Sequence, residues 1–285
     1  MSFRYRVVDV FTERALEGNA LAVFPEGAAI EERLMQPIAR EMNLSETVFF
    51  LPPTRKDCAA RLRIFTTQRE LRFAGHPTVG AAWVLLDEGL QAAEGRFLLE
   101  EPVGAVPIRV DREGLIWLTT PPIEFGETYD AAASAEALGL TREDLLGPAP
   151  QMVGAGNRMI FIAVKDRAAV DRAWLEMAGL RRMKGADEDP TGVFVFSPVA
   201  EGAYSRMFAP ELGVVEDPAT GSATGPLAAY MIRHGLAAGQ ARARWVSEQG
   251  TKMGRRSLLH VHIAEDGGIE VGGRVTPVAE GTLRV

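Results

Sequence analysis

An internal repeat is the feature of this sequence that most constrains how it can fold. Three blocks recur in the same order: GNALAVF at 18–24 as GNRMIFIAV at 156–164, ETVFFLP at 46–52 as GVFVFSP at 192–198, and RIFTTQRELRFAGHPTVGAAWVLL at 63–86 as RMFAPELGVVEDPATGSATGPLAAYMI at 206–232. Because order and approximate spacing are kept, we expect each half of the chain to form the same structural unit.

The local patterns predict strands and one buried helix in each repeat. Runs rich in β-branched and aromatic residues predict strands at 5–11, 19–24, 46–52 and 60–66. Residues 79–86, VGAAWVLL, are apolar throughout, which is typical of a helix buried on all sides. Pro77 suits the first turn of that helix and Gly89 its C-terminal end. Aligning Gly75 with Gly221 brings the second apolar helix into register with the first.

These elements predict an α+β fold of two pseudo-symmetric halves, each a curved, mostly antiparallel sheet or barrel around a central apolar helix. The Pro-rich stretch TTPPIEFGE, residues 119–127, indicates the crossing between halves. We therefore expect an N-terminal half at 1–118 and a C-terminal half at 119–274, with the tail 275–285 returning to the first half. A cleft between the halves is the expected place for an active site.

Composition narrows the function classes. Hydrophobic residues make up 47% and charged residues 24% of the 285, as in ordinary globular proteins. The net charge of −7 argues against nucleic acid or an anionic membrane as partner. No apolar run is long enough to span a bilayer, and the first residues alternate as in a strand rather than a signal peptide, so we expect a cytoplasmic protein. The single cysteine, Cys58, excludes disulfides and any chemistry that needs two thiols.

Both predicted central helices begin with small and hydroxyl residues, in AGHPT and in DPATGSATGP. Free backbone N–H groups and the positive end of the helix dipole favour a carboxylate at such a place. The alignment sets His76 opposite Ser222. We expect His76 on the turn before its helix, where it can bind a substrate or shuttle a proton. The alternative is that Thr78 and Ser222 only cap their helices.

Two carboxylates stand out beside these helix starts. Glu46, in NLSETVFF, aligns with Gly192, so one half has an acid where the other has none. A one-sided acid suggests a single general base, with a pKa raised by burial near Val48 and Phe49. Alternatively, Glu46 is a surface carboxylate. Asp217 either holds a substrate amine or receives a proton, or it only forms a turn before Pro218.

No metal site is predicted. His234, His260 and His262 lack an accompanying cysteine or carboxylate at metal-ligand spacing. His260 and His262 alternate along a predicted strand and point to one face, which indicates core or solvent positions rather than a ligand set.

Five blocks of the chain resemble the PhzF family of phenazine-biosynthesis-like isomerases: DVFTERALEGNALAVF, NLSETVFF, RIFTTQRELRFAGHPTVGAA, EDPATGSATGPLAAYM and QGTKMGRRSLLHV. The resemblance implies the diaminopimelate epimerase fold, a homodimer, and proton transfer without a cofactor on a small carboxylate of the dihydro-hydroxyanthranilate type. It implies Glu46 as base, with His76 and Asp217 assisting proton movement or binding substrate. The residues that it implies hold the substrate carboxylate are Ser45, Gly75, Gly221 and Ser222.

The chain departs from the family pattern at Ala20, where many relatives have proline, and at Arg72, which stands where proline is expected. Relatives that use cysteines carry a thiol near each helix start, whereas this chain has Ala74 and Thr220 there. Two readings besides the isomerase remain open: an epimerase or lyase acting on an amino acid derivative, and a non-catalytic protein that binds a small anion.

Overall fold

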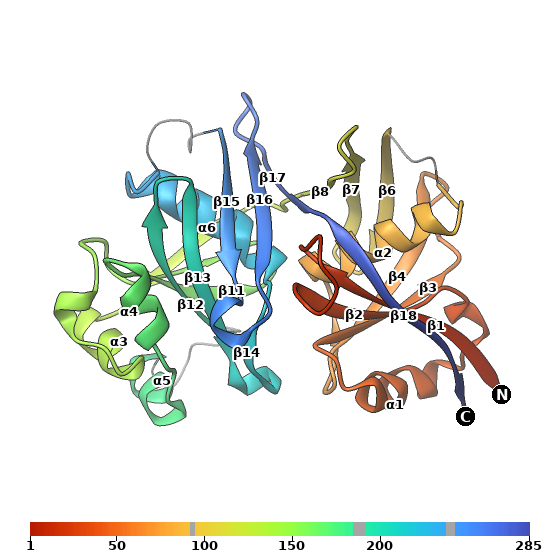
Figure 1. Ribbon diagram of the computed structural model, residues 1–285, viewed down its shortest axis with the longest axis horizontal. Coiled ribbons are helices and arrows are strands. Elements are labelled where there is room, and N and C mark those ends of the chain that lie inside the picture. Colours follow the sequence, from red (N-terminus) through yellow and green to blue (C-terminus); the bar gives the residue numbers. More distant parts are fainter. Residues whose placement is uncertain (92–94, 185–191, 238–242) are drawn as a thin grey trace. The chain divides into compact units, whose positions relative to one another are not determined.

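The structure is a computed structural model that describes residues 1–91, 95–184, 192–237 and 243–285. The chain divides into two compact units (Figure 1): Met1–Thr119 together with Glu270–Val285, and Thr120–Ile269. The boundaries expected from the sequence lay after residues 118 and 274.

The first unit is a curved sheet whose strands pair in the order β18–β1–β2–β3–β4–β6–β7–β8–β17, with β5 added beside β4. The strands are β1 (Ser2–Val10), β2 (Asn19–Phe24), β3 (Glu46–Leu51), β4 (Cys58–Phe65), β5 (Glu70–Leu71), β6 (Gly95–Glu101), β7 (Gly104–Val110), β8 (Ile116–Thr119), β17 (Ile269–Gly273) and β18 (Val275–Arg284). Figure 1 shows the last strand, in dark blue, beside the first, in red. The C-terminal tail thus lies in the sheet of the first unit.

The second unit pairs its strands in the order β9–β10–β11–β12–β13–β15–β16, with β14 added beside β13. The strands are β9 (Glu124–Thr128), β10 (Gln151–Gly154), β11 (Arg158–Ala163), β12 (Gly192–Val199), β13 (Gly202–Ala209), β14 (Val214–Asp217), β15 (Arg244–Gln249) and β16 (Ser257–Ile263). Outside the sheets lie α1 (Glu32–Met42) in the first unit and α3 (Ala131–Ala137), α4 (Arg167–Arg172) and α5 (Met177–Lys184) in the second.

The two sheets have the same pattern of strand directions. Strand β2 runs parallel to β3 and β4 parallel to β6, while their other neighbours are antiparallel. In the second unit β11 runs parallel to β12 and β13 parallel to β15, again among antiparallel neighbours. The predicted α+β fold of two pseudo-symmetric halves is therefore confirmed.

Each sheet surrounds one apolar helix of thirteen residues, α2 (Gly75–Asp87) or α6 (Gly221–Arg233). Helix α2 packs against β1, β2, β3, β8 and β18, and α6 packs against β10, β11 and β16. Both helices begin at the glycine that the sequence alignment placed in register. Because apolar residues face every side, the surrounding strands can bury the whole helix except its ends. Among the described residues, no helix is long and apolar enough to cross a membrane.

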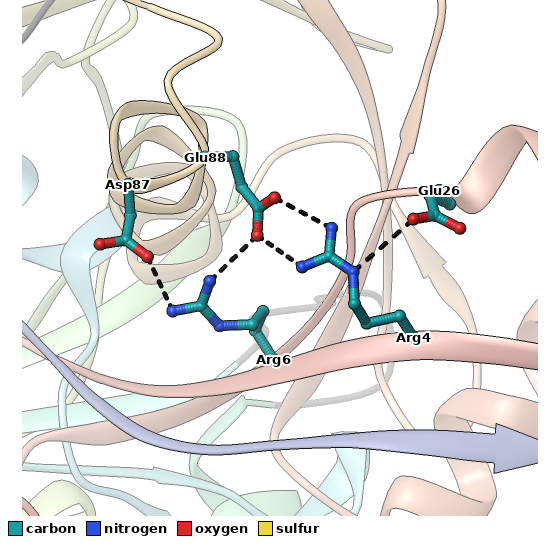
Figure 2. Close-up of polar contacts among 5 residues, drawn as sticks. All are labelled: Arg4, Arg6, Glu26, Asp87 and Glu88. Carbon is teal, nitrogen blue, oxygen red and sulfur yellow. Dashed lines mark hydrogen bonds and ion pairs between the residues drawn. The ribbon is translucent and has the colours of Figure 1, made fainter.

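Ion pairs hold the C-terminal end of α2 (Figure 2). Asp87 and Glu88 stand at this end, where the helix dipole disfavours negative charge. Arg4 donates two hydrogen bonds to Glu88, and Arg6 donates to both acids. Gly89 follows with a φ of 70°, as predicted for the residue that ends this helix. The arginines of β1 thus fix the end of α2 that lies away from His76.

Candidate functional site

Helix α2 begins earlier than the sequence suggested, so the prediction that His76 lies on the turn before the helix is wrong. Ala74 is the N-cap, and His76 is the second helical residue, with a side chain only 4% exposed. Pro77 follows at the third position, where the missing N–H leaves no hydrogen bond unmade. Thr78 lies inside the first turn and does not cap the helix. The helix therefore starts at Gly75 and carries the imidazole with it.

The His76 ring lies between Asn19 and Glu46 within the first unit. Its Nδ1 lies 3.2 Å from the amide nitrogen of Asn19, at the start of β2. Because an amide nitrogen only donates, Nδ1 is the acceptor and the ring proton sits on Nε2. That Nε2 lies 3.4 Å from Oε2 of Glu46, the first residue of β3. The structure thus brings together two of the predicted site residues, Glu46 and His76.

Burial keeps the imidazole neutral. It lowers the pKa of His76 from its usual 6.5 to about 3, because the ring is removed from water on all sides. A neutral ring with its proton on Nε2 is a potential hydrogen-bond donor beside the carboxylate, and this Nε2 makes no hydrogen bond with the residues that the structure describes.

Glu46 and Ser45 lie where β3 begins. The Glu46 side chain is 15% exposed, and its residue pairs with Leu21 of the parallel strand β2. Ser45 precedes the strand and is half-buried. Position 46 is thus a carboxylate at a strand end rather than the fully exposed surface acid of the alternative reading.

The second unit repeats this arrangement with different side chains. Thr220 is the N-cap of α6, and Ser222 is the second helical residue, as His76 is in α2. Asn157, the counterpart of Asn19 in the repeat, donates a hydrogen bond of 3.5 Å to the Ser222 hydroxyl. An asparagine thus contacts the second residue of the central helix in both units.

Asp217 ends β14 and is buried, with 8% exposed. Its Oδ2 accepts a hydrogen bond from the Thr220 hydroxyl at 2.5 Å. Gln249, at the end of β15, donates from its amide nitrogen to the Asp217 carbonyl at 2.7 Å and to the Thr220 hydroxyl at 2.9 Å. Its amide oxygen accepts from the Thr220 backbone N–H at 3.1 Å. Gln249 therefore fixes both the turn and the direction of the Thr220 hydroxyl proton.

The counterpart of Glu46 cannot carry a side chain without rearrangement. Gly192 begins β12 as Glu46 begins β3. A Cβ atom at Gly192 would lie 2.5 Å from the Phe208 carbonyl oxygen on the neighbouring strand, well inside van der Waals contact. The close packing of β12 on β13 therefore keeps a side chain out of this position in the second unit, whereas the first unit has Glu46 there.

An arginine–glutamate pair supports the strand before each central helix. Arg206 of β13 donates two hydrogen bonds to Glu216, at 2.9 and 2.8 Å. Arg63 of β4 donates likewise to Glu70, both bonds at 2.7 Å. In the second unit the pair holds β14 in place, and with it Asp217.

Sequence reasoning missed four polar residues near the helix starts: Asn19, Asn157, Gln249 and Glu101. The two asparagines carried a signal, since the repeated GN pair was part of the alignment. Gln249 and Glu101 carried none, because only the tertiary structure shows that these polar residues are buried, at 0% and 3% exposed.

Across the described ranges, no group of three or more His, Cys, Asp or Glu side chains is arranged to hold a metal ion. His260 and His262 are half-buried on β16. The Glu46–His76 pair belongs to the first unit and the Asp217–Ser222 group to the second. That both groups act on one substrate stays a prediction.

Comparisons with known proteins identify the family. The family model described as phenazine biosynthesis-like protein, PhzC-PhzF, matches residues 8–281. An uncharacterised isomerase of Mesorhizobium japonicum is 35% identical over 98% of both chains. The trans-2,3-dihydro-3-hydroxyanthranilate isomerase of Pseudomonas aeruginosa is 36% identical over 98% of both chains. A solved structure from Pseudomonas aeruginosa, described as a predicted epimerase, is 36% identical over 99% of both chains, with a TM-score of 0.83.

These matches span nearly the full length of the chain and of the relatives. The repeat, the two central helices and the Glu46–His76 pair all lie inside the matched residues. The chain therefore belongs to the phenazine biosynthesis-like PhzC-PhzF family and is an isomerase of the PhzF type.

Proposed function

We propose that this protein moves a proton between two carbons of a small cyclic carboxylate, without a cofactor, with Glu46 as the general base. The observation that carries the proposal is the placement of the Glu46 carboxylate 3.4 Å from the neutral, Nε2-protonated ring of His76. A carboxylate beside a neutral hydrogen-bond donor is suited to accept a proton from carbon and release it again.

The chemistry balances within the substrate. Glu46 takes a proton from an sp³ carbon, and the electron pair of the broken C–H bond forms a new C=C bond. The existing double bond shifts, and a proton is returned to the far carbon. The enol formed in this way tautomerises to a ketone, so no atom is gained or lost. His76 hydrogen-bonds to the carboxylate or the substrate, and Asp217 binds substrate or relays the proton.

The substrate carboxylate is held by the helix N-termini. Gly75 and Gly221 are the first residues of α2 and α6, so their backbone N–H groups have no partner within the helix. In this proposal Ser45, which precedes β3, and Ser222, the second residue of α6, add hydroxyl groups that bind the carboxylate. A relative named trans-2,3-dihydro-3-hydroxyanthranilate isomerase supports a substrate of that class.

Racemisation by two cysteines is not available to this chain. The N-cap positions of the two central helices hold Ala74 and Thr220, and the only cysteine, Cys58, is buried at the start of β4. The one-sided base favours an isomerase over a two-base epimerase.

Turnover of trans-2,3-dihydro-3-hydroxyanthranilate in heavy water tests the proposal. The product should carry deuterium at the newly protonated carbon, insofar as the base exchanges with solvent. Glu46→Gln keeps the shape but removes the base, and should lower kcat by about 10²- to 10⁴-fold. Glu46→Asp keeps an acid at a shifted position and should lose less.

Equal turnover by wild type and Glu46→Gln would remove Glu46 from the role of base. Binding of the carboxylate without turnover or proton exchange would instead favour the anion-binding protein. Light scattering tests the homodimer, which stays a prediction.

A further inference from the structure

Glu101 is a buried carboxyl group that the proposed reaction does not use. It ends β6, is 3% exposed, and lies against the first turn of α2. Within the described residues no ion pair involves it. A buried carboxylate without a cation is costly, so its protonation state needs an explanation.

The hydrogen bonds of Thr78 indicate the protonation state of Glu101. The Thr78 hydroxyl lies 2.7 Å from the Ala74 carbonyl oxygen and 2.5 Å from Oε1 of Glu101. A hydroxyl has one hydrogen and can donate it to only one of these acceptors. The other contact then needs a hydrogen from elsewhere, and only the Glu101 carboxyl can provide it.

The second unit shows which way the Thr78 hydroxyl points. Thr224 stands at the same place in α6 as Thr78 in α2, four residues after the N-cap. It donates to the N-cap carbonyl, that of Thr220, at 3.0 Å. By the same geometry Thr78 donates to Ala74, and Glu101 donates to Thr78.

The counterpart of Glu101 in the second unit is Gln249. Ser205 pairs with Gln249 across the parallel strands β13 and β15. In the first unit Arg61 pairs with Glu100, which sets Glu101 beside the next residue, Leu62. Because LRIF at 62–65 aligns with SRMF at 205–208, Glu101 and Gln249 occupy equivalent positions.

Their contacts are similar, although Gln249 reaches the hydroxyl of the N-cap residue itself, Glu101 reaches that of Thr78, and Glu101 Oε2 has no hydrogen-bond partner among the described residues. Gln249 accepts a hydrogen bond from the N-cap N–H of α6 and donates to a threonine hydroxyl of the same turn. Glu101 interacts with the backbone of Ala74, the N-cap of α2, and contacts the Thr78 hydroxyl. A protonated carboxyl group has one acceptor and one donor, as an amide side chain does.

We propose that Glu101 is a neutral carboxylic acid that does for α2 what the Gln249 amide does for α6: it positions the first turn without placing a negative charge behind it. The functional part of this inference rests on the proposed function. A neutral residue leaves the positive end of the α2 dipole to the substrate carboxylate, whereas an ionised Glu101 would compete for it.

The charged groups around Glu101 do not hold it ionised. A cavity of about 390 Å³ on its strand side is lined by Glu32, Arg61, Leu62, Arg63, Glu70, Glu100, Glu101 and Pro102. Arg63 is engaged by Glu32 and Glu70, and Arg61, whose buried Nε has no hydrogen-bond partner, forms no ion pair with Glu101 within the described residues. On the α2 side the Thr78 hydroxyl contacts Glu101. Burial raises the pKa of Glu101 to about 8, in agreement with the hydrogen count.

Infrared spectroscopy of the ligand-free protein tests the protonation directly. At about pH 6 the wild type should show the C=O stretch of a protonated carboxylic acid, which lies apart from the carboxylate bands. That band should disappear in Glu101→Gln and persist in Glu100→Gln, a matched change at the neighbouring residue of β6. A wild-type spectrum without the band, or one unchanged by Glu101→Gln, overturns the proposal. If Glu101→Gln does not fold, loss of the wild-type band between about pH 6 and pH 10 carries the same test.

Kinetics then tests the positioning role. The wild-type KM for the anionic substrate should rise by about fivefold above pH 8, as the charge appears behind the α2 N-terminus. In Glu101→Gln the rise should be absent, with kcat at pH 7 near that of wild type. A KM that rises equally in both overturns the role in substrate binding. Since the infrared result needs no substrate, its outcome does not depend on whether the proposed isomerisation is correct.

Discussion

The Nε2 atom of His76 lies 3.4 Å from Oε2 of Glu46, although the two residues come from a helix start and a strand start thirty positions apart. Asn19 holds the other ring nitrogen, so the contact has a defined direction.

The two asparagines should affect different kinetic constants. Asn19→Leu removes the group that keeps the His76 proton on Nε2, and should lower kcat by about tenfold with little change in KM. Asn157→Leu frees the Ser222 hydroxyl and should mainly raise KM. Steady-state kinetics of both variants gives the comparison, and a kcat that is unchanged in Asn19→Leu would contradict the role assigned to the tautomer.

His76 should remain neutral across the physiological pH range. Its pKa is lowered from 6.5 to about 3 by burial, so the folded protein resists protonation. The unfolded chain takes up this proton below about pH 6.5, and stability is therefore lost as pH falls from there toward about 3. Nitrogen-15 NMR should show a neutral Nε2–H ring from about pH 5 to 8. The His76 resonance is assigned from its absence in His76→Gln, and a midpoint near 6.5 would count against burial as the controlling effect.

Glu101 should give the protein a stability that falls as pH rises. Its folded-state pKa is raised from 4.5 to about 8, so the folded state keeps a proton that the unfolded chain has lost. Stability from this group is complete below about pH 4.5 and is lost between there and about pH 8, by an amount on the order of a few kcal/mol. Urea unfolding of Glu101→Gln should lack this slope and exceed the wild-type stability at pH 8. If the unfolding free energies of wild type and Glu101→Gln depended on pH in the same way, this prediction would be contradicted.

The arginine pairs should differ in stability because they differ in burial. Arg206 and Glu216 have side chains 4% and 9% exposed, against 18% and 34% for Arg63 and Glu70. Arg206→Met leaves a buried carboxylate unpaired and should cost about 3–5 kcal/mol. Arg63→Met, the matched change in the other unit, should cost less than about 1 kcal/mol, because water solvates the remaining acid. Chemical unfolding of both variants measures the difference.

The repeat, both central helices and most strands could be predicted because they depend on local patterns. Apolar residues at every position from Val79 to Leu86 leave a buried helix as the simplest solution, and the aligned glycines placed its partner correctly. Pro77 lies in the first turn of α2 as predicted, but the helix already begins at Gly75, ahead of the histidine that was placed on the preceding turn. His76 therefore lies in the helix and not on the preceding turn.

The polar contacts around the helix starts could not be predicted in the same way. Asn19 and His76 are 57 positions apart. The pairing of β2 with β3 brings Asn19 toward Glu46, and the packing of α2 against these strands brings His76 there. Glu101 and Gln249 look like ordinary exposed residues at strand ends. Their burial depends on how the sheet closes over the helix. The periodicity of the sequence does not show this closure.

The crowding at Gly192 has an evolutionary consequence. If the two halves arose by duplication, the second copy cannot acquire a carboxylate at this position by a single substitution, because any side chain would strike the Phe208 carbonyl 2.5 Å away. A backbone shift of β13 would have to come first, and it would disturb the neighbouring strand that carries Asp217. Divergence of the halves at this position is therefore difficult to reverse, and a second base would have to arise elsewhere in the fold.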